Sequence, residues 1–174
     1  MKKMGINYGS FTGVTEGIAE IIAEKLGITE SDVHNVANTD VAIAMRYDLL
    51  FLGSSTWGDG ELQDDWGDLL PTLEHADLSG KVIALFGCGD SSAHSHTFCD
   101  AIGILYDALK DTGAKFCGSC DPSDYLFKHS RAVVNGRFVG LPIDEMNESN
   151  RTEERIESWL KNLKSYCPSQ HNPN

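Results

Sequence analysis

The stretch "YGSFTGVT", Tyr8–Thr15, joins a short apolar run to a long amphipathic segment. The run before it, "MGINYG", predicts a β-strand, and the segment after it, "GVTEGIAEIIAEKLG", predicts a helix. The apolar residues that share one face of this helix are Ile18, Ile21, Ile22 and Leu26. If this order of strand, loop and helix repeats along the chain, it indicates an α/β fold.

The same alternation continues through the chain. Further strands are expected around Val33 and in "YDLLFLGSS" (47–55), "KVIALFGCGD" (81–90) and "AKFCGSC" (114–120). Further helices are expected in "LQDDWGDLLPTL" (62–73), stopped or kinked near Pro71, in "FCDAIGILYDALKDTG" (98–113), and from Thr152 through "EERIESWLKNLKSY" (153–166). The fifth strand is interrupted by "DPSDYLFKHS" (121–130) and resumes in "AVVNGRFVGLPI" (132–143). This pattern predicts a parallel sheet covered on both faces, which binds ligands beyond the carboxyl ends of its strands.

Length and composition indicate one globular domain. The 174 residues suit a single domain, placed at residues 1–167, with residues 168–174 as a disordered tail. The net charge of −12 argues against nucleic acids and anionic membranes as partners. No apolar run is long enough to cross a bilayer, and the start "MKKMGINYGS" resembles a strand more than a signal peptide. The five scattered cysteines fit reduced thiols, so we expect the protein in the cytoplasm. We also expect it to be a monomer.

The loop "GSFTGVT" (9–15) is suited to binding a phosphate group. Backbone N–H groups at a helix start point outward with the positive end of the helix dipole. Ser10, Thr12 and Thr15 add hydroxyl donors, and Gly13 permits close approach of the backbone. Val14 stands where a nucleoside triphosphatase loop needs lysine, and the spaced glycines of a dinucleotide site are missing. Neutral donors alone suit one terminal monophosphate, and the alternative is a plain helix cap.

Two further loops, "SSTWGDGELQDDW" (54–66) and "FGCGDSSAHSHTF" (86–98), follow the third and fourth predicted strands. Together with "YGSFTGVT", "AVVNGRFVGLPIDE" (132–145) and "ERIESWLKNLK" (154–164), they make the chain resemble the long-chain flavodoxins over nearly its whole length. The resemblance implies a flavodoxin-like, doubly wound, five-stranded parallel sheet in the order 2-1-3-4-5. It also implies helices on both faces, an insertion that splits the last strand, and flavin mononucleotide (FMN) as the cofactor of a single domain.

The resemblance assigns the cofactor-binding residues by position. It implies that the phosphate is enclosed by Ser10, Phe11, Thr12, Gly13, Val14 and Thr15. It implies one wall of the isoalloxazine site from Ser55, Thr56, Trp57, Gly58, Asp59 and Gly60, with the Trp57 indole stacked on the ring. The pyrimidine edge is assigned to Cys88, Gly89 and Asp90, the opposite face to His94, a nearby place to Cys99, and the ribityl chain to Asp144. Gly58 is where flavodoxins commonly turn a peptide toward the reduced ring.

Several of these residues also allow another interpretation. An isolated tryptophan is often a core residue, but an acidic loop gives Trp57 little core to enter. Flavodoxins usually have tyrosine at the position of His94, so the imidazole either stacks on the ring or faces solvent, and both remain open. "CGSC" (117–120) resembles a redox dithiol but lies in a strand, so we expect two non-catalytic thiols. We expect no metal site, because the nearby histidines and cysteines occupy flavin-contact positions.

An acidic run follows the third predicted strand. Between Tyr47 and Gly80 the chain has eight acidic residues and no Lys or Arg. The acidic residues just past Trp57 are Asp59, Glu61, Asp64, Asp65 and Asp68. The usual explanation of such a run is a solvated helix face. Negative charge here also opposes addition of electrons to a nearby ring and steers a positively charged partner toward it.

The function expected from these observations is low-potential, single-electron transport by bound FMN, without catalytic residues. The resemblance implies a flavodoxin/ferredoxin–NADP reductase as partner, with photosystem I or another ferredoxin-dependent enzyme as a further candidate. The alternative is a flavodoxin-like NAD(P)H:quinone oxidoreductase, which needs a nicotinamide or quinone pocket that no insertion here supplies. A phosphorylation-dependent response regulator is excluded, because its acidic positions are occupied by Gly9, Ser10, Ser54 and Ser55.

Overall fold

The computed structural model describes residues 2–166, and its centre is a parallel sheet. The strands run in the order β2 (Val33–Asn35), β1 (Met4–Gly9), β3 (Leu49–Trp57), β5 (Val82–Cys88) and β6 (Lys115–Cys117). β4 (Glu61–Leu62) is a short arm antiparallel to β3, so β5 and β6 correspond to the fourth and fifth strands expected from the sequence. The observed order confirms the predicted order 2-1-3-4-5 and the α/β class.

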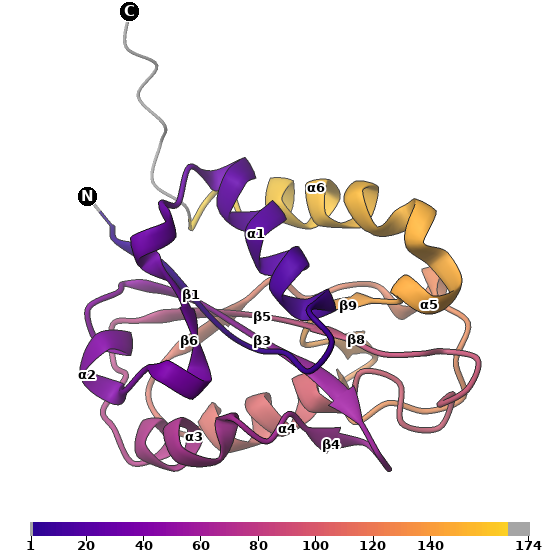
Figure 1. Cartoon of the computed structure of the whole chain (residues 1–174), viewed down its shortest axis with the longest axis horizontal. Coiled ribbons are helices and arrows are strands. Elements are labelled where there is room, and N and C mark those ends of the chain that lie inside the picture. The colour runs from indigo at the N-terminus through magenta and orange to yellow at the C-terminus, as the bar shows by residue number, and fades with distance from the viewer. Residues whose placement is uncertain (1, 167–174) are drawn as a thin grey trace, which may run out of the picture.

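Helices cover both faces of this sheet (Figure 1). α1 (Val14–Leu26) and α6 (Thr152–Asn162) lie on one face, and α3 (Trp66–Glu74) and α4 (Asp100–Leu109) lie on the other. In β3, Leu49 and Phe51 pack in the core on the first face, whereas Leu50 and Leu52 pack in the core on the second. Successive side chains of a strand point to opposite faces, so this unbroken apolar run is buried only between two layers of helices.

The last strand of the sheet is split between two segments, as the sequence predicts. β6 pairs with the first part of β5, at residues 82–84. β9 (Gly140–Ile143) pairs with the remaining part, at residues 85–88. The long insertion therefore leaves the sheet after β6 and returns to the same neighbouring strand, which places the end of β9 beside the end of β5.

The predicted resumption of this strand at Ala132 is wrong. Residues 133–138 form an antiparallel hairpin of β7 (Val133–Val134) and β8 (Arg137–Phe138), which is separate from the main sheet. The hairpin turns at Asn135 and Gly136, which both have positive φ. Asn-Gly favours such two-residue turns because both residues tolerate this backbone conformation. Only the four residues of β9 continue the strand.

Two further boundaries differ from the prediction. β3 extends through the start of the predicted loop to Trp57, because its last residues pair with β4. α3 does not stop at Pro71 but continues to Glu74, and the predicted alternative, a kink at Pro71, stays a prediction. The buried side chains of this helix are Trp66, Leu69, Leu70 and Leu73. Their burial on both sides of Pro71 stabilises the helix against the loss of one backbone hydrogen bond.

The remaining described elements are short. They are α2 (Val41–Ala44), α5 (Glu145–Glu148) and the 3₁₀ turns η1 (Glu30–Asp32), η2 (Val36–Asn38), η3 (Pro122–Asp124) and η4 (Ser149–Arg151). Within residues 2–166, no helix is both long and apolar enough to cross a membrane. The predicted disordered tail, residues 168–174, lies outside the described residues, and the assignment of a single domain stays a prediction.

Candidate functional site

A cleft lies where the loops after β1, β3 and β5 meet, at the carboxyl ends of these strands. It is lined by Phe11, Thr12, Val14, Ser55, Thr56, Trp57, Gly58, Cys88, Gly89, Asp90, His94, Thr97, Glu145 and Met146. All of these except Thr97, Glu145 and Met146 are residues that the sequence assigns to the cofactor. Parallel strands end at the same edge of a sheet, which is why loops far apart in the sequence form one cleft.

The loop before α1 leaves backbone donors available at the start of the helix. Gly13 is the N-cap residue, and its φ of 88° lies in the left-handed region that glycine adopts without strain. Its N–H donates to Ser10 Oγ at 3.1 Å. No side chain of the described residues caps the first amides of α1, and such amides have no carbonyl partner inside a helix. This end of the cleft therefore offers N–H donors and a positive dipole end to an anion.

Two aromatic side chains form an exposed apolar wall. Trp57 is 42% exposed and Phe11 is 48% exposed. Their ring centroids lie 4.9 Å apart, and the rings meet edge to face at 67°. Trp57 Nε1 donates to Leu62 O at 3.2 Å, so the β4 arm fixes the orientation of the indole. An indole held at its edge and open on a face is suited to stacking against a planar ligand.

The loop after β5 supplies the polar wall of the cleft. Asp90 Oδ1 accepts a hydrogen bond from Ala93 N at 2.9 Å and another from Asn147 Nδ2 at 2.9 Å. These bonds, that from Ala93 above all, hold the pKa of Asp90 below its ordinary value. His94 is exposed and lines the same cleft as Trp57. The cleft thus combines an apolar wall, a polar wall and an anion-binding end.

Comparison with known proteins agrees with this geometry. A sequence model of the flavodoxin family matches residues 6–159. The chain belongs to the flavodoxin family. Flavodoxin 1 of Azotobacter vinelandii is 46% identical over 164 residues, which cover 92% of this chain and 94% of that protein. Flavodoxin 1 of Escherichia coli K12 is 43% identical over 160 residues, 91% of either chain. The crystal structure of Fusobacterium nucleatum flavodoxin bound to flavin mononucleotide has a TM-score of 0.88 at 34% identity, covering 97% of this chain and all of that one (100%).

Family membership also fixes the functional class. Flavodoxins transfer electrons between redox proteins and are not enzymes with a substrate of their own. The predicted membership of the flavodoxin family and the predicted class of electron carrier are both confirmed by the match to the family and by the similar flavodoxins, whereas the long-chain type stays a prediction.

Several assigned cofactor residues do not line the cleft. They are Ser10, Gly13, Thr15, Asp59, Gly60, Cys99 and Asp144. Thr15 is fully buried, and its Oγ1 donates to Cys88 Sγ at 3.5 Å. Cys99 is fully buried, and its sulfur lies close to Gly89. A Cβ added at Gly89 would be only 3.0 Å from the Cys99 sulfur. Asp144 is only 1% exposed. Direct cofactor contacts of these residues stay predictions.

Sequence reasoning missed three residues that line the cleft. Thr97 lies further along the loop after β5, and Glu145 and Met146 begin α5, directly after β9. Met146 is 75% exposed, so it adds an apolar side chain to the rim of the cleft. For Glu145 and Met146, the signal in the sequence that could have indicated a place in the cleft was the position of "IDEM" (143–146) at the end of the last strand. A segment that follows a parallel strand lies at the same edge of the sheet as the other loops.

The "CGSC" pair lies outside the cleft. Cys117 ends β6, and its Sγ donates to Ile83 O at 3.7 Å. Burial raises the pKa of the Cys120 thiol to about 12, which opposes formation of a reactive thiolate. Among residues 2–166, no group of three or more His, Cys, Asp or Glu side chains is arranged to hold a metal ion.

Proposed function

We propose that this chain binds FMN in the cleft and carries single electrons between larger redox proteins. The observation that carries the proposal is the convergence of an uncapped helix start, an exposed tryptophan and a polar loop on one cleft. The FMN bound to the similar Fusobacterium nucleatum flavodoxin supports the same cofactor here. When bound, FMN supplies the redox chemistry, and the protein supplies binding, shielding and orientation.

The protein's donors suit each end of this cofactor. The loop from Ser10 to Thr15 contains no Lys or Arg, so it binds the phosphate through N–H groups and the hydroxyls of Ser10 and Thr12. Trp57 stacks on one face of the ring, and the backbone from Cys88 to Asp90 meets the pyrimidine edge. Ser55 lines the same cleft, and its Oγ is buried without a hydrogen-bond partner among the described residues. A bound ligand can satisfy this hydroxyl, whose burial alone is unfavourable.

The acidic rim, defined as Asp59, Glu61, Asp64, Asp65 and Asp68, follows Trp57 along the chain and is exposed. Together with the net charge of −12, it attracts a basic surface toward the cleft from a distance. The partners that fit are a flavodoxin/ferredoxin–NADP reductase and, as electron acceptors, photosystem I or another ferredoxin-dependent enzyme. In this proposal the chain acts in the cytoplasm.

Neutralising part of the acidic rim should slow electron transfer without weakening FMN binding. Asp64→Asn with Asp68→Asn removes two exposed charges, whereas Asp65 accepts a hydrogen bond from Gln63 Nε2 at 2.7 Å and is left intact. Stopped-flow rates with the reductase at low salt should fall about threefold to tenfold, because steering depends on unscreened charge. The matched control, Glu24→Gln with Asp111→Asn, removes the same charge elsewhere. Equal rates for the two double variants would contradict docking at the rim.

Gly58 should influence the first reduction potential. Its φ of 55° is left-handed, and a Cβ there would lie 3.0 Å from Glu61 Oε2. In Gly58→Ala, the added Cβ strains the left-handed backbone, and a turn of this peptide toward the ring changes that strain, so the first one-electron potential should shift by the equivalent of about 1 kcal/mol. Potentiometric titration measures this shift. Gly67→Ala, in α3 with open space around the new Cβ, is the control. Unchanged potentials in Gly58→Ala would exclude such a hinge.

The proposed function and its enzyme alternative differ in a simple assay. Apoprotein should take up one FMN per chain and, by itself, should not oxidise NADPH. Addition of the reductase should then reduce the bound FMN, and the reduced protein should pass electrons to an added acceptor protein. Steady turnover of NADPH and a quinone by the purified protein alone would favour an NAD(P)H:quinone oxidoreductase.

A further inference from the structure

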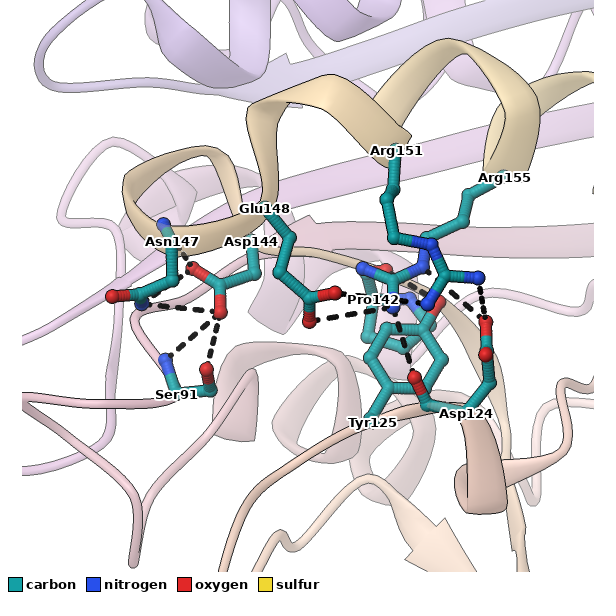
Figure 2. Close-up of polar contacts among 9 residues, drawn as sticks. All are labelled: Ser91, Asp124, Tyr125, Pro142, Asp144, Asn147, Glu148, Arg151 and Arg155. Carbon is teal, nitrogen blue, oxygen red and sulfur yellow. Dashed lines mark hydrogen bonds and ion pairs between the residues drawn. The ribbon is translucent and has the colours of Figure 1, made fainter.

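Hydrogen bonds join the loop after β5 to the segment after β9, and Figure 2 shows those between Ser91 and Asp144. Gly89 N donates to Ile143 O at 3.0 Å. Two residues on, Ser91 donates to Asp144 Oδ2 through its N–H at 3.3 Å and through its hydroxyl. Each of these bonds joins the polar wall of the cleft to the residues that lead into α5. The position of that wall therefore depends on α5.

Asn147 joins the same two segments. Its backbone N–H donates to Asp144 Oδ1 at 3.2 Å, and its Nδ2 lies 2.9 Å from Asp144 Oδ1 and 2.9 Å from Asp90 Oδ1. An amide NH₂ has two hydrogens, so one side chain can donate to both carboxylates. It thereby offsets the repulsion between two negative groups, one on each segment. We call the pair Asp144 and Asn147, which joins the two segments, the latch.

Ion pairs also hold the other end of α5 in place. Glu148 pairs with Arg155 at 3.3 Å and with Arg151 at 3.7 Å. Arg155 is only 6% exposed, and its guanidinium lies 4.0 Å from the ring centroid of Tyr125. Tyr125 in turn donates its hydroxyl to Pro142 O at 2.9 Å, beside the latch (Figure 2). These contacts attach α5 to α6 and to the inserted segment 121–130.

We propose that Asp144 and Asn147 are positioning residues that set the affinity for the flavin ring by holding the loop from Gly89 to His94 in place. This inference rests on the proposed FMN function. Asp144 is 1% exposed, and both of its carboxylate oxygens already accept hydrogen bonds from Ser91 and Asn147. It therefore acts on the ring through the loop, not as a direct ligand of the ribityl chain.

The test compares three flavins that share the ring and differ in the side chain. FMN, riboflavin and lumiflavin carry a ribityl phosphate, a ribityl group and a methyl group at the same ring nitrogen. Asn147→Ala should raise the Kd for all three by one common factor of about tenfold or more, in line with the loss of hydrogen bonds to charged groups. Asp144→Asn should raise it by a larger common factor. Asn150→Ala, an exposed asparagine outside the latch, should leave all three unchanged. An effect that disappears with lumiflavin would overturn the proposal in favour of a direct ribityl contact.

Hydrogen exchange in the apoprotein separates the latch from the cofactor. Asn147→Ala should speed exchange of the Ser92 and Ala93 amides, which donate to Asp90, while the amides of β3 stay as protected as before. Asn147 is exposed, so this variant is expected to fold. Unchanged exchange of the two loop amides would overturn the latch even if FMN binds. Faster exchange in a protein that binds no flavin would instead support the latch and reject the proposed function.

Discussion

Trp57→Ala is expected to weaken FMN binding about 30-fold, or about 2 kcal/mol, because stacking of an aromatic side chain on a planar base contributes about 1–3 kcal/mol. The structure places this indole at the mouth of the cleft, 42% exposed and anchored through Nε1 to Leu62 O. A ring stacked on the indole would cover part of this exposed surface. Fluorescence titration of FMN with apoprotein measures the change directly.

Two controls distinguish stacking from a general loss of structure. Trp57→Phe keeps an aromatic face but loses the Nε1 donor, so its Kd should stay within about fivefold of the original value. The melting temperature of the Trp57→Ala apoprotein should change little, because the indole lies outside the buried core. An unchanged FMN affinity in Trp57→Ala would show that the ring does not lie against this residue.

Riboflavin, which lacks the phosphate, should bind at least about 100-fold more weakly than FMN, because several hydrogen bonds to a charged group contribute about 1.5–3 kcal/mol each. The loop that would bind the phosphate has no Lys or Arg. When mobile surface cations bind an anion, added salt weakens the binding steeply. Here no such cation is present in the loop, so the affinity for FMN should change little with salt. Isothermal titration at low and high salt measures both effects.

A loop variant links this preference to the helix start. Gly13 has a φ of 88°, and a Cβ there would meet no atom within 4 Å. Gly13→Ala therefore disturbs the backbone of the loop without a steric clash, at a cost of about 1–2 kcal/mol. The Kd for FMN should rise about tenfold, while the Kd for riboflavin stays nearly the same. An equal loss for both flavins would indicate that the phosphate binds elsewhere.

The sequence predicted best where one physical signal dominated. The apolar runs of β3 and β5 have no stable place except between two layers of helices, so the parallel sheet followed from them. The interruption of the last strand was also visible, because the polar segment 121–130 breaks its apolar run. The loop before α1 was expected at the ligand-binding edge because glycine and hydroxyl residues stand between a strand and a helix, and Phe11, Thr12 and Val14 do line the cleft.

Predictions were poorer where tertiary contacts decide between local alternatives. The hairpin in "AVVNGRF" was missed for another reason, because its Asn-Gly pair is a local turn signal that was interpreted as part of a continuous strand. Pro71 should end a helix by its local effect, but buried leucines on either side hold α3 together. The place of Met146 in the cleft was missed, although "IDEM" follows β9, the segment that returns beside β5.

The measurement that tests the account most directly is stepwise reduction of the FMN-loaded protein, followed by its absorption spectrum. The account predicts a yellow protein whose bound flavin takes up two electrons in separate steps. At half reduction, a long-wavelength band should appear that belongs neither to the oxidised nor to the fully reduced protein, and it should vanish with the second electron. A purified protein that takes up no FMN, or a flavin that passes directly to full reduction without such a band, would contradict single-electron transport by this chain.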